Sequence, residues 1–93
     1  EYFSPFPTLS LEAAEYLASV PLKGVGTDAI SIDPMDTTDY PVHKLLLGAG
    51  FVNTENLCRL APLAGRSVPY LTLPLHFKDA DGAPVRAIAI LDT

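Results

Sequence analysis

The stretch that decides the fold is Val42-His43-Lys44-Leu45-Leu46-Leu47-Gly48-Ala49-Gly50, followed by Phe51-Val52-Asn53-Thr54-Glu55. It places a histidine near the start of an apolar run and a carboxylate twelve positions later, with two glycines between them. An imidazole nitrogen and a carboxylate oxygen together suit a borderline divalent ion such as zinc. Two elements held in register could aim both side chains inward.

Two ligands alone do not make a zinc site, because structural zinc takes about four protein ligands and catalytic zinc about three plus a water. The only other histidine is His76, and the only cysteine is Cys58. Taken in isolation, His43 is most simply interpreted as a helix cap or packed polar residue, and Glu55 as a solvated carboxylate. Either the pair binds no metal, or the remaining ligands come from polypeptide outside this sequence.

The composition predicts one small folded domain over residues 1–93. Hydrophobic residues make up 48% of the chain and charged residues 18%, which argues against disorder. A chain of this size has little apolar surface to spare for a core. We therefore expect its apolar faces to need a partner surface.

Charge and hydropathy exclude two classes of partner. A formal net charge of -5, with only 6 Lys plus Arg, gives no footprint for a phosphate backbone, so we expect no nucleic acid. No apolar run reaches bilayer length and no segment resembles a secretory signal, so we expect no membrane partner and a cytoplasmic location.

Cys58 has no cysteine partner and is predicted to be a small buried residue. The start at Glu1 rather than Met suggests processing, trimming or a fragment.

The N-terminal half predicts a helix, a strand and a loop in that order. Ser10 is a typical N-cap for a helix that ends before Pro21. Residues 24–27 are predicted to form a short buried strand, and residues 28–39 a polar, turn-rich connection.

The central stretch predicts a second helix or turn over residues 39–47, closed by Gly48. A strand then runs from Gly50 through Thr54. This arrangement puts His43 near the start of one element and Glu55 at the end of the next.

The C-terminal third predicts a β-hairpin. Residues 68–77 and 85–91 are β-rich, and Asp81-Gly82 in the connection is a strong hairpin signal. Both faces of the second strand are apolar, so we expect this sheet to be covered on both sides.

Taken in order, these segments resemble the C-terminal part of the cyclase family of metal-dependent hydrolases, which includes bacterial kynurenine formamidases and isatin hydrolases. The resemblance covers nearly the whole chain. It rests on Pro7-Thr8-Leu9-Ser10-Leu11-Glu12-Ala13-Ala14, Gly24-Val25-Gly26-Thr27-Asp28, Ser31-Ile32-Asp33-Pro34, His43-Lys44-Leu45-Leu46-Leu47, Glu55-Asn56-Leu57, Leu73-Pro74-Leu75 and Asp81-Gly82-Ala83-Pro84-Val85-Arg86-Ala87-Ile88-Ala89.

The resemblance implies an α/β fold with the family's layered β/β/α arrangement, here an incomplete C-terminal portion with a mixed sheet and one or two helices. It implies that His43 is a zinc ligand and that Glu55 ligates, and can bridge, two metal ions. Glu55 favours the two-metal type, because the isatin hydrolase branch can carry glutamine there. Zinc is the expected cofactor and manganese the alternative.

The implied function is cleavage of an amide or cyclic amide C–N bond in a small molecule by metal-activated water. The family's main metal motif, histidine, three residues, histidine, one residue, aspartate, has no match here, so the catalytic residues stay unknown. The implied amidohydrolase site is complete only with an N-terminal half or a partner chain, and family members form homo-oligomers. The alternative is a non-catalytic remnant or a binding and assembly module of the same fold.

Two further expectations concern the aspartate-rich loop. A carboxylate or carbonyl bonded to the second ring nitrogen of His43 would fix its tautomer, and this loop is the place to look for that partner. Asp28 and Asp33 are otherwise expected to satisfy local backbone donors. His76 is expected to be exposed or packed at an edge.

Overall fold

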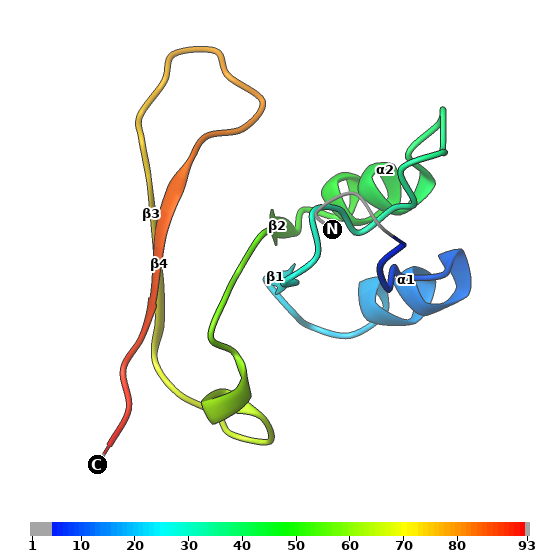
Figure 1. Cartoon of the computed structure of the whole chain (residues 1–93). Coiled ribbons are helices and arrows are strands. Elements are labelled where there is room, and N and C mark those ends of the chain that lie inside the picture. Colours follow the sequence, from blue (N-terminus) through cyan, green and yellow to red (C-terminus); the bar gives the residue numbers. More distant parts are fainter. Residues whose placement is uncertain (1–4, 93) are drawn as a thin grey trace. The chain divides into compact units, whose positions relative to one another are not determined.

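A computed structural model describes residues 5–92, which form two compact units that divide between Cys58 and Arg59 (Figure 1). The first unit contains α1 (Leu11–Ala18), β1 (Gly24–Gly26), α2 (Pro41–Gly48) and β2 (Val52–Thr54). The second contains a 3₁₀ turn, η1 (Ala61–Leu63), followed by β3 (Tyr70–Pro74) and β4 (Val85–Ala89). The described chain is thus a small α/β protein, as predicted.

Helix α1 begins where the sequence predicts. The Ser10 hydroxyl oxygen accepts a hydrogen bond from the Ala13 N–H at 3.0 Å, which satisfies one of the free donors of the first turn. The helix ends at Ala18 with Ser19 as its C-cap, before Pro21. Its buried residue is Ala14, which leaves room for close approach of another helix.

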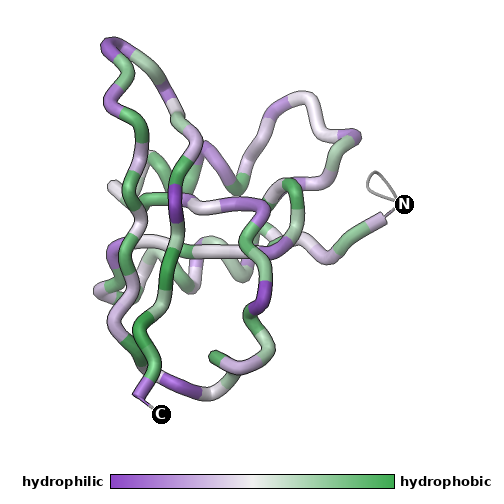
Figure 2. Tube along the Cα trace, turned by 60° about the vertical axis from the view of Figure 1, so that its left-hand side comes forward, coloured by the Kyte–Doolittle hydropathy of each residue, from purple (hydrophilic) through white to green (hydrophobic). Residues whose placement is uncertain are grey.

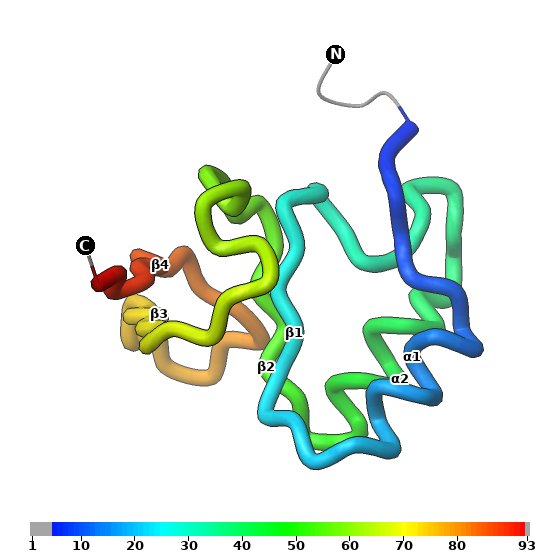
Figure 3. The backbone as a smooth tube through the Cα atoms, turned by 90° about the horizontal axis from the view of Figure 1, so that it is seen from below, coloured from blue at the N-terminus to red at the C-terminus, as the bar shows by residue number. Residues whose placement is uncertain are grey.

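Strands β1 and β2 pair in parallel, with Gly24 opposite Val52 and Gly26 opposite Thr54. Helix α2 lies between them in the chain, so the three elements form a β-α-β unit. Gly24 is required by this close pairing, because a Cβ atom there would collide with the Val52 carbonyl oxygen. Figure 3 shows β1 beside β2 and α1 beside α2.

The core of the first unit lies between the helices and this small sheet. Leu46 and Val42 point inward from α2, with exposed fractions of 0% and 1%. The buried cluster consists of Ala14, Ile32, Val42, Leu46 and Phe51. This core is small, so each of its side chains carries a large share of the hydrophobic stabilisation.

Strands β3 and β4 confirm the predicted hairpin. They pair antiparallel from Tyr70 opposite Ala89 to Pro74 opposite Val85. The Leu75 N–H also donates to the Pro84 carbonyl oxygen at 3.2 Å. The connection is therefore a long loop rather than a two-residue turn at Asp81-Gly82.

Three features differ from the sequence prediction. The predicted mixed sheet is instead two two-stranded sheets, one parallel and one antiparallel, because the paired segments are short and belong to separate units. No residue of β3 or β4 is buried, so the second unit by itself does not provide the predicted cover over both faces. Cys58 is exposed rather than buried, because it follows β2 outside the apolar core.

Apolar residues recur along both strands of the hairpin (Figure 2). One face carries the cross-strand pair Leu71 and Ile88, which are 41% and 39% exposed. A two-stranded sheet on its own is marginally stable in water. Exposed apolar faces on such a sheet therefore indicate a surface that contacts other polypeptide.

None of the helices in the described part of the chain combines the length and the apolar character that crossing a membrane requires.

The core predicts a sharp contrast between two neighbouring leucines of α2. We expect Leu46→Ala to lower the free energy of unfolding by about 2–5 kcal/mol, because the buried side chain leaves a cavity. Leu47→Ala is the matched control, since Leu47 is 51% exposed and its loss should cost far less. Urea unfolding followed by circular dichroism measures both; equal losses would contradict this assignment of the core.

Candidate functional site

The N-terminus of α2 is capped by a side chain from the preceding loop. The N-cap residue, Tyr40, has a left-handed backbone (φ 48°) and makes no side-chain cap, while Pro41 at the first helical position has no N–H to satisfy. The next two N–H groups donate to Asp33: Val42 to Oδ1 at 3.1 Å and His43 to Oδ2 at 2.9 Å. One carboxylate therefore satisfies both remaining donors of the first turn.

The same carboxylate holds the imidazole ring of His43. His43 Nδ1 lies 2.8 Å from Asp33 Oδ2, and His43 Nε2 lies 2.9 Å from Glu55 Oε2. The Tyr40 ring meets the imidazole edge to face, with ring centroids 5.8 Å apart. The ring is thus fixed between two carboxylates from opposite sides, and the two predicted site residues are in direct contact.

Glu55 follows β2 directly and is held by more than the histidine. Its Oε2 atom also accepts hydrogen bonds from the Ile32 backbone N–H and from Asn53 Nδ2, each at 3.1 Å. These donors fix the carboxylate in place next to His43. Asn53 lies two positions before Glu55, so strand alternation puts both side chains on one face.

The cluster has a buried end and an accessible end. The Asp33 side chain is 0% exposed, whereas those of His43 and Glu55 are 23% and 25% exposed. Any solute that reaches the cluster would therefore meet His43 and Glu55 rather than Asp33.

The charge of Asp33 is stabilised by its donors. Burial by itself raises the pKa of this carboxyl, but the hydrogen bonds from the His43 backbone, the His43 ring and the Val42 backbone lower it by more. The net pKa lies below the ordinary value of 3.8, so Asp33 is a carboxylate at neutral pH.

The proton count on His43 follows from these contacts. Ionised carboxylates only accept hydrogen bonds, so the contact with Asp33 places a proton on Nδ1. The contact with Glu55 requires a second proton, on Nε2 or on the Glu55 carboxyl. A cation could take the place of that second proton without disturbing the first.

The pair fits two ligands of a metal ion. Zinc–nitrogen and zinc–oxygen bonds are about 2.0–2.2 Å long, so two ligand atoms of a tetrahedral site lie roughly 3.3–3.6 Å apart. His43 Nε2 and Glu55 Oε2 lie 2.9 Å apart, so the two atoms would move slightly apart to hold an ion between them. Within residues 5–92, no group of three or more His, Cys, Asp or Glu side chains is placed to hold a metal ion. The two residues therefore fit part of a ligand set.

The remaining predicted residues lie elsewhere. Asp28 is exposed and makes no bond to the cluster in the first unit, and His76 is exposed in the second unit. The aspartate-rich loop does supply the partner of the second ring nitrogen, namely Asp33. The contact from the Ile32 N–H was not predicted, because a backbone donor leaves no signature in the sequence.

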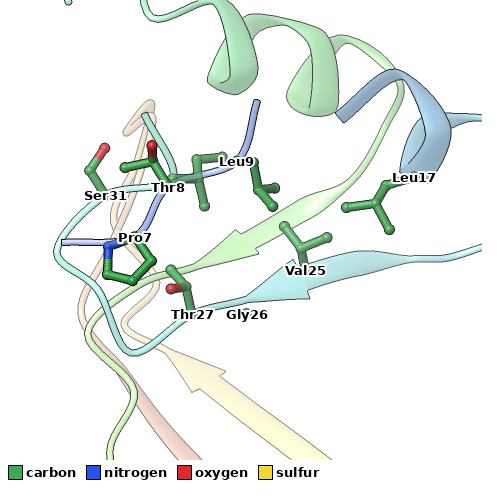
Figure 4. A pocket seen from close by; sticks show the side chains of 9 residues that line it. Pro7, Thr8, Leu9, Leu17, Val25, Gly26, Thr27 and Ser31 are labelled. Carbon is green, nitrogen blue, oxygen red and sulfur yellow. The ribbon is translucent and has the colours of Figure 1, made fainter. Parts of the chain in front are cut away.

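A mainly apolar pocket of about 330 Å³ lies beside β1 (Figure 4). Neither His43 nor Glu55 lines it, but Ser31 and Ile32 do, and these two residues hold Asp33 and Glu55 in place. Its lining residues are Pro7, Thr8, Leu9, Leu17, Val25, Gly26, Thr27, Ser31 and Ile32.

Curated proteins similar to this chain include kynurenine formamidases. The kynurenine formamidase of Salinibacter ruber is 46% identical over 72 residues, which are 77% of this chain and 34% of that protein. The kynurenine formamidase of Bacillus cereus is 33% identical over 88 residues, which are 95% of this chain and 42% of that protein. The chain thus spans about a third to two-fifths of the length of these relatives. No family model matches it. No solved structure matches it either.

The capping carboxylate makes stability depend on pH. Because the pKa of Asp33 is lowered by folding, its contribution is fully present above the ordinary value of 3.8 and is lost as the pH falls through the lower folded value. Near neutral pH we expect Asp33→Asn to lower the free energy of unfolding by about 1–3 kcal/mol.

Urea titrations of both proteins across the acid range measure this difference, which should shrink as the pH falls. Asp36→Asn, at an exposed position of the same loop, is the matched control and should stay close to the parent. A difference of constant size at every pH would show that the charge of Asp33 is not its source.

Proposed function

We propose that this chain, a kynurenine formamidase-like sequence of the cyclase family, supplies His43 and Glu55 as ligands to the metal site of a hydrolase that cleaves an amide or cyclic amide C–N bond. The observation that carries the proposal is the direct approach of His43 Nε2 to Glu55 Oε2 at 2.9 Å, with the other ring nitrogen held by Asp33. The names of the relatives support an amide as the substrate class.

Zinc is the proposed ion and manganese the alternative. Bound there, the ion would supply a water acidic enough to ionise near neutral pH and a charge that stabilises the developing oxyanion. The chain's own residues bind and orient: His43 offers Nε2 while Nδ1 keeps its proton on Asp33, and Glu55 offers a carboxylate already aligned by Ile32 and Asn53.

The remaining ligands, and the group that moves protons to and from the substrate, come in this proposal from polypeptide outside these 93 residues. Residues 1–93 would then be the C-terminal portion of a single domain with the family's layered β/β/α arrangement. The relatives, of which the chain spans 34% and 42%, are long enough to hold such a complementary portion. We propose a small-molecule amide as substrate, without naming one.

The exposed hairpin supports a protein partner. Large apolar side chains, Leu71, Leu73 and Ile88 among them, are exposed on β3 and β4. Leaving such a surface in water is unfavourable. The proposed cover is a second copy of this chain or a complementing N-terminal chain.

One observation favours a second candidate function. Within the described residues only two ligands converge, short of the three protein ligands typical of catalytic zinc. A non-catalytic binding or assembly module of the same fold would need no metal, and the bonds of His43 to Asp33 and Glu55 would serve only to stabilise its structure. Metal binding discriminates the two candidates, because the module has no need of His43 as a ligand.

The ligand assignment predicts a contrast between the two histidines. We expect His43→Ala to lower the zinc content of the purified protein by at least about tenfold, because a ligand is lost. His76→Ala is the matched control, since His76 is exposed and belongs to the second unit. Elemental analysis after dialysis against zinc measures both; equal zinc in parent and His43→Ala would remove the ligand assignment.

The partner proposal predicts self-association through the hairpin. The parent should have a mass above that of one chain by light scattering coupled to gel filtration. The double variant Leu71→Asp/Ile88→Asp should run as one chain, because charges replace a cross-strand apolar pair. Lys78→Asp, in the exposed loop, controls for added negative charge. A monomeric parent would exclude the second copy and leave the complementing chain.

A further inference from the structure

Three consecutive loop residues organise the whole cluster. The Ser31 hydroxyl oxygen accepts from the Asp33 N–H at 3.0 Å, which fixes the turn. The Ile32 N–H donates to Glu55 Oε2, and the Asp33 carboxylate accepts from His43. A single turn thus holds both proposed ligands, one through its backbone and one through a side chain.

Asp33 controls the ring of His43 in two ways. The backbone N–H and the ring Nδ1 of His43 converge on the same oxygen, Asp33 Oδ2, at 2.9 and 2.8 Å. Two contacts from one residue to one oxygen restrict the rotation of its side chain. Because the carboxylate only accepts, it also keeps the proton on Nδ1 and leaves Nε2 as the coordinating atom.

This control is more than helix capping. The cap requires only the backbone donors of Val42 and His43, whereas the ring contact is additional. The buried position of Asp33 keeps it away from water and from any substrate, so it cannot take part in chemistry directly.

We propose that Asp33 is a positioning residue that fixes the orientation and tautomer of His43 so that Nε2 faces Glu55 and a metal ion. The inference rests on the proposed function for the metal, but the control of the ring exists without it. Ser31 supports the same arrangement from behind, through its bond to the Asp33 N–H.

The test compares the full chain with Asp33→Asn and with the control Asp36→Asn. Asparagine remains a good helix cap, so the variant keeps an oxygen for the backbone while losing the charged acceptor for the ring. Nitrogen-15 NMR of the metal-free proteins in mildly alkaline solution reports whether Nδ1 of His43 carries a proton. Zinc affinity is measured separately, by competition with a chelator.

We expect Nδ1 to be protonated in the parent and in Asp36→Asn, and to lose that preference in Asp33→Asn. Zinc affinity should fall about 10–100-fold in Asp33→Asn only. Ser31→Ala keeps the carboxylate and should show a smaller shift in the same direction, which provides a second reading should Asp33→Asn fail to fold.

The outcomes separate this inference from the proposed function. If the parent binds zinc and folded Asp33→Asn keeps both its Nδ1 proton and its affinity, the positioning role is overturned and the ligand assignment stands. If the parent binds no zinc but the Nδ1 proton still depends on Asp33, the proposed metal function fails and control of the ring stands. An equal loss of affinity in Asp36→Asn would overturn the positioning role as well.

Discussion

The buried carboxylate of Asp33 is the constraint on which the first unit depends. Removing a carboxylate from water is costly unless several donors compensate it. Here the donors are the Val42 N–H, the His43 N–H and the His43 ring, all from the first turn of α2. The helix start also favours negative charge because of its dipole. The loop can bury Asp33 only when α2 is formed, and α2 has its cap only when the loop is in place.

The β-α-β topology explains why His43 and Glu55 meet. In a parallel pair joined through a helix, the chain leaves β1 at its carboxyl end, so α2 starts at that edge of the sheet. β2 ends at the same edge, and Glu55 is the next residue. A helix start and a strand end thus face one another, which brings residues twelve positions apart to 2.9 Å. This edge is where ligands bind in open α/β sheets.

The sequence predicted the positions of the helices better than it predicted which side chains are buried. Ser10 and the apolar run between His43 and Gly48 mark α1 and α2, because caps and periodicity are local features. The loop was expected to hold the partner of His43, but its aspartates look alike in sequence, and only burial singles out Asp33. Cys58 was predicted wrongly because its exposure depends on where the core ends, which no local signal reports.

The site combines a fixed end with an exchangeable end. Asp33 is buried and keeps the Nδ1 proton in place, so the ring orientation needs no further ordering when a ligand arrives at Nε2. The contact between Nε2 and Glu55 Oε2 lies at the accessible end, where a proton and a cation would compete for the same lone pairs. For the proposed ion, having both ligand atoms already close together would lower the cost of binding, whereas breaking the hydrogen bond between them would oppose it. In the proposed site the Asp33–His43 contact therefore matters most, because it holds Nδ1 and leaves Nε2 on the accessible side, next to Glu55.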